Sequence, residues 1–172
     1  GTGPNKLLRN NSDDSFQDAS GPSGLAGGDF SSRDAGFGDF DEDGDIDLLV
    51  VNSDAGDALF SNQREGIFKD ISDQAGLESA EGSRALSVGD YNNDGFLDLF
   101  VASEKAGQSK LYQNTGDGSF KVDRSSEELE ETLKQIKAYD AVFLDFDNDG
   151  YLDLLVVGEA KEEGGSGVAL YH

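Results

Sequence analysis

The stretch Asp39-Phe-Asp-Glu-Asp-Gly-Asp-Ile-Asp47 recurs in related form as Asp90-Tyr-Asn-Asn-Asp-Gly-Phe-Leu-Asp98 and Asp145-Phe-Asp-Asn-Asp-Gly-Tyr-Leu-Asp153. All three copies fit the pattern D-x-[DN]-x-D-G-x-x-D, and their first residues lie 51 and 55 positions apart. Several carboxylates folded into one turn repel one another strongly unless a cation lies among them. The sequence therefore predicts three metal-binding loops.

Within each loop, the oxygen donors fall at positions 1, 3, 5 and 9, and position 7 can offer its backbone carbonyl. A cage of hard oxygen ligands without His or Cys selects Ca²⁺ over zinc or copper, and Mg²⁺ is disfavoured because it keeps its water. We expect three Ca²⁺ sites, with weaker binding at the second because an amide replaces one carboxylate. The expected ligands are Asp39, Asp41, Asp43, Asp45 and Asp47 in loop 1, Asp90, Asn92, Asp94, Phe96 and Asp98 in loop 2, and Asp145, Asp147, Asp149, Tyr151 and Asp153 in loop 3.

The EF-hand is the obvious competing calcium motif, and the sequence excludes it. An EF-hand loop needs a bidentate Glu at position 12 and a helix on either side. Position 12 is occupied by Val50, Val101 and Val156, and β-type apolar runs flank all three loops. Each loop therefore leads directly into a strand.

A second motif recurs between the loops, as Leu7-Leu-Arg-Asn10, Leu59-Phe-Ser-Asn62 and Leu111-Tyr-Gln-Asn114, and the chain closes on Leu170-Tyr-His172. These spacings define three repeat periods, approximately 7–58, 59–110 and 111–169, in a single segment that covers residues 1–172.

The middle period contains four short β-type runs, at 84–90, 97–102, 110–114 and 119–122. Four strands in about 50 residues are typical of a β-propeller blade. The fold class is therefore all-β: a half blade over residues 7–20, two four-stranded antiparallel blades and a three-stranded blade. The strand after each loop is apolar on both faces, so we expect both of its faces to be covered.

One segment departs from this pattern. Residues 125–138 predict a short inserted helix, because Ser125 and Glu128 fit a capping box and Leu129, Leu133 and Ile136 recur at helical spacing. The other two periods carry Gly-rich loops here, at 19–28 and 74–82.

The composition narrows the classes of function. The chain has 172 residues, with 36 acidic and 13 basic side chains and a formal net charge of −23. Such a charge argues against binding nucleic acid or anionic membranes, and no apolar run is long enough to insert into a membrane. His172 is the only histidine and Cys is absent, so neither a Ser/His/Asp triad nor a Cys nucleophile is expected. We interpret acidic residues outside the loops, such as Asp54, Asp57 and Glu104, as solvated.

The three loop strings resemble the calcium loops of FG-GAP/VCBS-type repeats, and the L-x-x-N element resembles the bacterial, ASPIC-like branch of that family. The resemblance implies Ca²⁺ bound by side chains at positions 1, 3, 5 and 9 and by the carbonyl at position 7, in propellers of about six to eight blades. Phe-Gly precedes only the first loop, as Phe37-Gly38, and no Gly-Ala-Pro follows any loop. Integrin-type ligand binding is therefore not expected.

We expect a non-catalytic, calcium-stabilised scaffold for protein recognition or adhesion on an exported protein, located outside the cell, on its surface or in the periplasm. The alternative is a carbohydrate-binding, lectin-like module or the propeller part of a polysaccharide-active enzyme, with Tyr91, Tyr112 and Tyr151 stacking on sugar rings. Packing between blades is the simpler role for these tyrosines. Three periods cannot close a ring, so we expect either further blades outside this segment or self-association.

Overall fold

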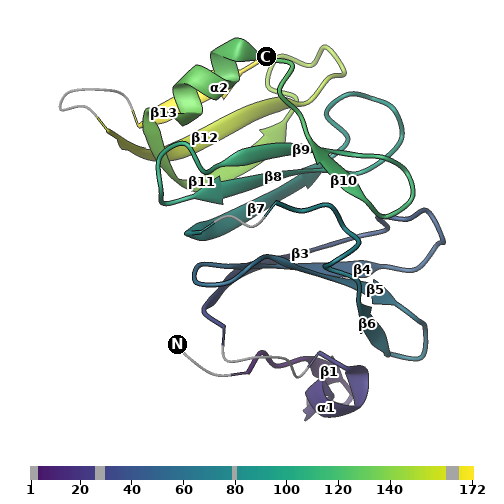
Figure 1. Cartoon of the computed structure of the whole chain (residues 1–172). Helices are drawn as coiled ribbons and strands as arrows, with labels where there is room; N and C mark the ends of the chain where they lie inside the picture. The colour runs from purple at the N-terminus through teal and green to yellow at the C-terminus, as the bar shows by residue number, and fades with distance from the viewer. Residues whose placement is uncertain (1–3, 26–29, 79–80, 162–166) are drawn as a thin grey trace.

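A computed structural model describes residues 4–25, 30–78, 81–161 and 167–172. These residues form β-strands in four antiparallel sheets, with two short helices (Figure 1). The elements are β1 (Leu8–Asn10), β2 (Phe16–Asp18), α1 (Ser20–Ser23), β3 (Ser32–Gly38), β4 (Asp47–Asn52), β5 (Ala58–Asn62), β6 (Phe68–Asp70), β7 (Ser83–Gly89), β8 (Asp98–Ser103), β9 (Lys110–Asn114), β10 (Phe120–Val122), α2 (Glu127–Leu133), β11 (Ile136–Leu144), β12 (Asp153–Ala160) and β13 (Val168–Tyr171).

The sheets confirm the all-β expectation and the expected series of a half blade, two four-stranded blades and a three-stranded blade. A two-stranded arm, β1–β2, precedes a four-stranded first sheet, β3–β6, a four-stranded second sheet, β7–β10, and a three-stranded third sheet, β11–β13. In each sheet of three or four strands, consecutive strands are neighbours, and the sheets lie one above another in an open stack (Figure 1). This is the arrangement of consecutive blades in a partial propeller.

The hydrophobic core is divided among the spaces between neighbouring sheets. One cluster, which includes Phe40, Leu49 and Leu99, joins the first and second sheets, and another joins the second sheet, the third sheet and α2. The close approach of the sheets requires small residues: a Cβ at Gly38 would lie 2.9 Å from Cδ1 of Leu97, and a Cβ at Gly89 would lie 2.9 Å from Cδ1 of Leu152. Each sheet therefore depends on its neighbour for burial.

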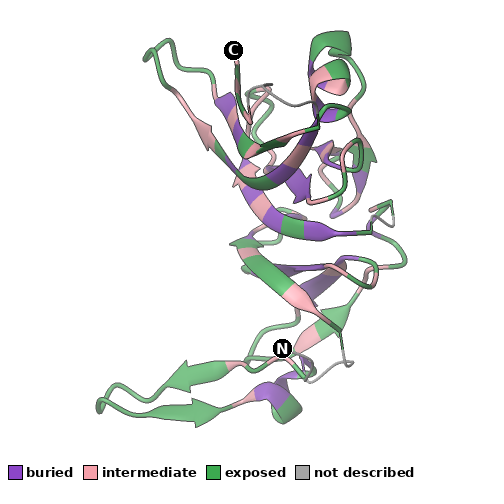
Figure 2. Cartoon of the chain, turned by 90° about the vertical axis from the view of Figure 1, so that its left-hand side faces the viewer, coloured by how far each residue is buried: buried purple, intermediate pink, exposed green. Residues whose placement is uncertain are grey.

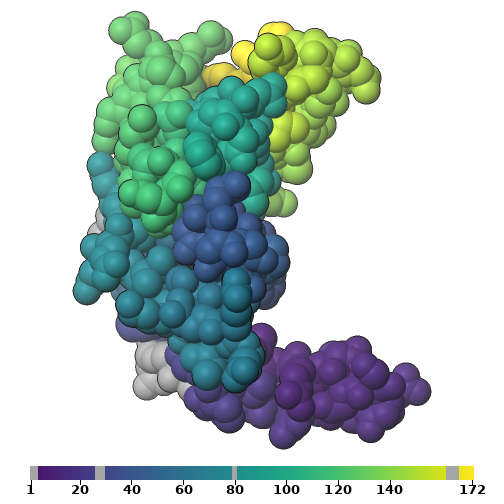
Figure 3. Space-filling model, turned by 90° about the vertical axis from the view of Figure 1, so that its right-hand side faces the viewer, coloured from purple at the N-terminus to yellow at the C-terminus, as the bar shows by residue number. Residues whose placement is uncertain are grey.

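The ends of the stack are open. Strands β4 and β8 are buried along their whole length, as expected. The same expectation is wrong for β12, where Val157 is 41 % exposed because the third sheet is covered on one face only. At the other end the β1–β2 arm projects from the stack, with Phe16 64 % exposed (Figures 2 and 3).

Helix α2 is shorter than the sequence predicts. The predicted N-cap, Ser125, donates its backbone N–H to Asp123 and does not cap the helix. The N-cap is Ser126, whose hydroxyl accepts the N–H of Leu129 at 3.2 Å. The helix ends at Leu133, because Ile136 already pairs with Ala160 in the third sheet.

The Gly-rich loop expected at 19–28 contains the four-residue helix α1, and residues 26–28 lie outside the described residues, as do 79–80 of the loop at 74–82. Within the described residues, neither helix is long and apolar enough to span a membrane.

Asp57 is not the solvated residue that the sequence suggests. Its side chain is buried between the first and second sheets, accepting the N–H of Asn52 at 2.9 Å and the hydroxyl of Ser83 at 3.1 Å. Burial raises the pKa of this carboxyl to about 6, from an ordinary value of 3.8. The ionised form is therefore disfavoured in the folded chain.

We predict that Asp57→Asn stabilises the chain at neutral pH. Because the folded-state pKa is raised, the stability that the carboxyl contributes is fully present below about pH 4 and is lost as the pH rises through about 6. The amide oxygen still accepts the N–H of Asn52, and the amide nitrogen donates to the Ser83 hydroxyl in a reversed bond, so no charge is buried. Urea denaturation at pH 7.5 should therefore show a gain of about 1–3 kcal/mol that shrinks towards pH 4.

Asp54→Asn is the matched control, because the exposed Asp54 carboxylate accepts the N–H of Ser31, which lowers its pKa. This control should not be stabilised at pH 7.5. A D57N variant less stable than the parent at that pH would contradict the prediction.

Candidate metal centre

The three acidic loops share one backbone conformation. In loop 1, the N–H of Phe40 donates to Oδ2 of Asp47 at 3.1 Å, and the N–H of Gly44 donates to Oδ2 of Asp39 at 3.0 Å. The same two bonds, from position 2 to position 9 and from position 6 to position 1, occur in the other loops. The donor–acceptor pairs are Tyr91–Asp98 and Gly95–Asp90 in loop 2, and Phe146–Asp153 and Gly150–Asp145 in loop 3.

The sharp reversal at position 6 requires glycine. Gly44, Gly95 and Gly150 have φ values of 87°, 95° and 91°, a region that L side chains rarely adopt. Backbone N–H groups of positions 5 and 7 then donate to the side chains at positions 3 and 5 in each loop. These backbone N–H groups hold the loop side chains in fixed orientations, and in loops 1 and 3 the oxygens of three carboxylates converge.

Loop 1 gathers three carboxylates closely. Oxygens of Asp39, Asp41 and Asp43 lie within 4.8 Å of one another. Burial, together with the charges of Asp43 and Asp39, raises the pKa of Asp41. The Oδ1 atom of Asp39 is buried and has no hydrogen-bond partner among the described residues. Such an orphaned acceptor beside two further carboxylates fits a bound cation. The side chain of Asp45 points elsewhere and pairs with Arg64, which leaves its carbonyl as the ligand that we predict.

Loop 2 presents fewer free carboxylate oxygens. Asn92 donates from Nδ2 to Oδ2 of Asp94 at 3.0 Å, while its Oδ1 accepts the N–H of Asp94. Asp98, at position 9, is fully buried, and burial raises its pKa to about 6. The hydrogen bond from the Asn92 amide therefore occupies an oxygen of Asp94 that would otherwise be free to bind a metal ion.

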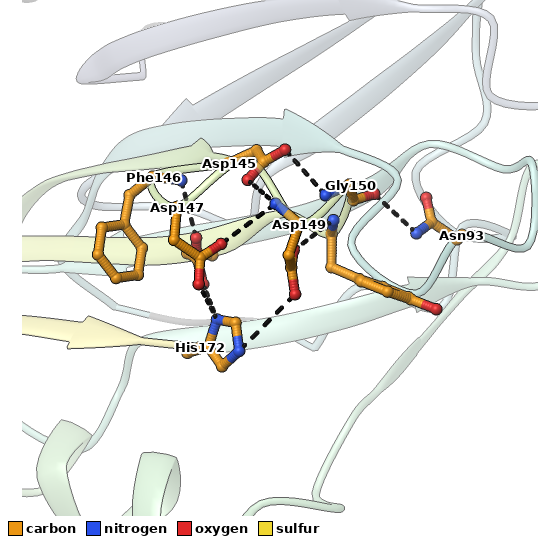
Figure 4. Close-up of polar contacts among 9 residues, drawn as sticks. Asn93, Asp145, Phe146, Asp147, Asp149, Gly150 and His172 are labelled. Atoms are coloured by element: carbon orange, nitrogen blue, oxygen red, sulfur yellow. Dashed lines mark hydrogen bonds and ion pairs between the residues drawn. The ribbon is translucent and has the colours of Figure 1, made fainter.

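Loop 3 lies beside His172, a residue that the sequence pattern did not connect with the loop (Figure 4). Oxygens of Asp145, Asp147 and Asp153 lie within 4.8 Å of one another, and the imidazole of His172 approaches the same loop. Its Nδ1 lies 2.8 Å from Oδ1 of Asp153, and its Nε2 lies 3.8 Å from Oδ2 of Asp149. These carboxylates raise the pKa of His172.

All fifteen predicted ligands lie in the three loops, and their roles as ligands remain predictions. Sequence reasoning missed three residues that support the loops: His172, Asn62 and Asn114. The recurrence of L-x-x-N gave a signal for the two asparagines. Each donates its backbone N–H to the position-9 carboxylate of its own loop, at 2.8 and 2.9 Å.

The tyrosines considered for sugar stacking occupy different environments. Tyr112 is 1 % exposed and lies in the core between the first two sheets. Tyr91 stacks on Phe143, and its hydroxyl donates to Asp123 at 2.6 Å. Tyr151 alone of the three is open to solvent, at 58 % exposed.

Comparisons with known proteins agree with the loops and the repeats. A family described as FG-GAP-like repeat matches residues 39–101 and 90–156. Cartilage acidic protein 1 of Homo sapiens is 26 % identical over 164 residues, covering 90 % of this chain and 24 % of that protein. The protein of the same name from Xenopus tropicalis is 30 % identical over 101 residues, covering 58 % of this chain and 15 % of that protein. The chain thus spans about a quarter of the human relative's length and a smaller share of the Xenopus tropicalis relative's length.

We predict that His172 stabilises the chain in the absence of divalent metal, and that it does so more strongly at acid pH. Because its pKa is raised in the folded chain, the stabilising imidazolium is fully present below about pH 6.5 and is lost as the pH rises through the folded value. In EDTA, His172→Gln should lower the melting temperature more at pH 6 than at pH 8.5.

The only histidine in the chain gives a direct check. An NMR titration of its ring in EDTA should give a pKa above 6.5. A normal or lowered value would show that the loop 3 carboxylates do not hold the imidazolium.

Proposed function

Because the chain belongs to the FG-GAP-like repeat family, we propose that loops 1, 2 and 3 each bind one calcium ion, and that the module is a non-catalytic scaffold for recognition or adhesion. The observation that carries this proposal is the convergence of carboxylates in loop 1, where Oδ1 of Asp39 is buried with no donor among the described residues. Bound calcium would neutralise the repulsion within a loop and fix its backbone.

The choice of calcium follows from the ligand chemistry. The side-chain donors predicted for the loops are carboxylate and amide oxygens, and each loop adds a backbone carbonyl. Hard oxygen donors in a flexible loop suit Ca²⁺, whereas Mg²⁺ demands a nearly ideal octahedron and retains water. In this proposal His172 borders site 3 and is not one of its calcium ligands.

An exported location agrees with the proposed sites. Extracellular calcium is millimolar, so sites of moderate affinity would be filled outside the cell and empty in resting cytosol. The relatives are named cartilage acidic protein, and this chain is also strongly acidic, with a net charge of −23. We propose an extracellular, cell-surface or periplasmic location for the module.

Titration calorimetry with CaCl₂ tests the metal sites. We expect three binding events, with loop 2 the weakest, and a loss of stability on adding EDTA of about 3–4 kcal/mol per site at a hundred- to thousandfold excess of calcium over Kd. Asn92→Asp should tighten loop 2, because it restores the fourth carboxylate and removes the amide donor that engages Asp94.

Matched charge removals complete the design. Asp43→Asn should weaken the binding event at loop 1, because it leaves three carboxylates and an amide as in loop 2, whereas Asp14→Asn, which removes a charge from the exposed turn of the β1–β2 arm, should leave all three events unchanged. The absence of calcium-dependent heat or stabilisation in the parent chain would refute the proposal.

The carbohydrate alternative rests on one observation, the exposure of the Tyr151 side chain in loop 3. A glycan array probed in calcium, with an EDTA control, distinguishes the two functions. The scaffold proposal expects no binding that depends on calcium. Reproducible EDTA-sensitive binding that is lost in Tyr151→Ala would favour the lectin-like function.

A further inference from the structure

Asn114 lies at the junction of two acidic loops, and its backbone N–H and both polar groups of its side chain form hydrogen bonds. Its backbone N–H donates to Oδ1 of Asp98 at 2.9 Å, and its Oδ1 accepts the N–H of Gly116 at 2.8 Å. Its Nδ2 donates to two carbonyls, that of Leu97 in loop 2 at 3.1 Å and that of Phe40 in loop 1 at 2.9 Å. One side chain of the second sheet therefore reaches the metal loop of the first sheet.

The repeat supplies its own comparison. Asn62 occupies the corresponding place in the first sheet, where its N–H donates to Asp47 and its Nδ2 donates to the carbonyl of Ile46 at 2.9 Å. Those bonds serve loop 1 alone, the loop of its own sheet. Asn62 and Asn114 thus make the same contacts with the loop of their own sheet, and the bond from Asn114 to Phe40 is an additional contact with the loop of the neighbouring sheet.

A continuous buried path joins the closing carboxylates of loops 1 and 2. It runs from Asp98 through Asn114 to the carbonyl of Phe40, and the N–H of Phe40 donates to Oδ2 of Asp47. These four residues are 0 %, 2 %, 0 % and 2 % exposed in that order. Buried hydrogen-bonded groups have few alternative partners, so a shift at one end of the path is costly unless the other end follows.

Packing makes the same junction rigid. The Leu97 side chain fills the space above Gly38, immediately before loop 1, and a Cβ at Gly118 would lie 3.1 Å from Cβ of Asp41. Leu152 packs on Gly89 in the same way at the next junction, but the hydrogen bond that joins loops 2 and 3, from Nδ2 of Asn93 to the carbonyl of Gly150 at 3.1 Å, is exposed. Exposed hydrogen bonds exchange readily with water and transmit little.

We propose that Asn114 is a positioning residue that couples calcium binding at loops 1 and 2, so that an ion in either loop raises the affinity of the other. This inference rests on the proposed calcium function. An ion held by loop 2 fixes Asp98 and the carbonyl of Leu97, and thereby fixes the amide that holds Phe40. Loop 1 then loses less freedom when it binds its own ion. The coupling must be reciprocal.

Site-resolved titration tests the proposal. The amide signals of Gly44, Gly95 and Gly150 report separately on the three loops in heteronuclear NMR. During a CaCl₂ titration, Asn114→Ala should weaken loops 1 and 2, each by about tenfold, the equivalent of one hydrogen bond, and leave loop 3 unchanged. The matched control Asn62→Ala should weaken loop 1 directly and loop 2 only through the coupling.

A second variant leaves the buried asparagine in place. Asp94→Asn removes a charge at an exposed position of loop 2. In the parent chain it should lower the affinity of loop 1 severalfold, and in the N114A background it should cause no further change at loop 1.

The outcomes separate the two proposals. If loop 1 binds equally well in the parent, D94N and N114A chains while calcium still shifts the signals, the coupling is refuted and the calcium function stands. If no glycine signal responds to calcium in the parent chain, the calcium function itself is refuted.

Discussion

The structure depends on holding like charges together at the turn between the first two strands of each sheet of three or four strands. Oxygens of three carboxylates lie within 4.8 Å of one another in loop 1, and again in loop 3. The position-9 carboxylates, Asp47, Asp98 and Asp153, are each at most 2 % exposed. Burying a charge is costly unless it is paired and hydrogen-bonded. Backbone N–H groups supply the hydrogen bonds in every loop, and a divalent cation is the partner that would balance the charge.

The same turns fix how the sheets stack. Each loop connects two neighbouring strands of one sheet. The loop geometry therefore sets the register of the strand pair, in which Gly38 lies opposite Asp47 and Gly89 lies opposite Asp98. The residue at position 8, Leu97 or Leu152, then packs on the glycine that precedes the loop of the sheet before it. Ile46 holds this position in the first sheet and is 52 % exposed, because only the two-stranded arm precedes that sheet. The acidic loops and the sheet packing are parts of one repeated junction.

The sequence predicted most of this arrangement, because its strongest signals are local and repeated. The acidic pattern located all three turns, and the apolar runs beside them located strands such as β4 and β8. Features that depend on contacts between repeats were not predictable from pattern. Asp57 looks like any acidic loop residue, yet Asn52 and Ser83 enclose it. The N-cap of α2 is Ser126 and not the predicted Ser125, because Ser125 is hydrogen-bonded to Asp123. The hydrogen bond from Asn114 to the carbonyl of Phe40 could not be predicted from the sequence, because it depends on how the first sheet packs beside the second.

A crystal structure grown in excess CaCl₂, with calcium located by its anomalous scattering, is the most direct test of the three proposed sites. We predict one ion in each loop, bound by the side chains at positions 1, 3, 5 and 9 and by the carbonyls of Asp45, Phe96 and Tyr151. Anomalous maps without a peak in any of the three loops would contradict this prediction.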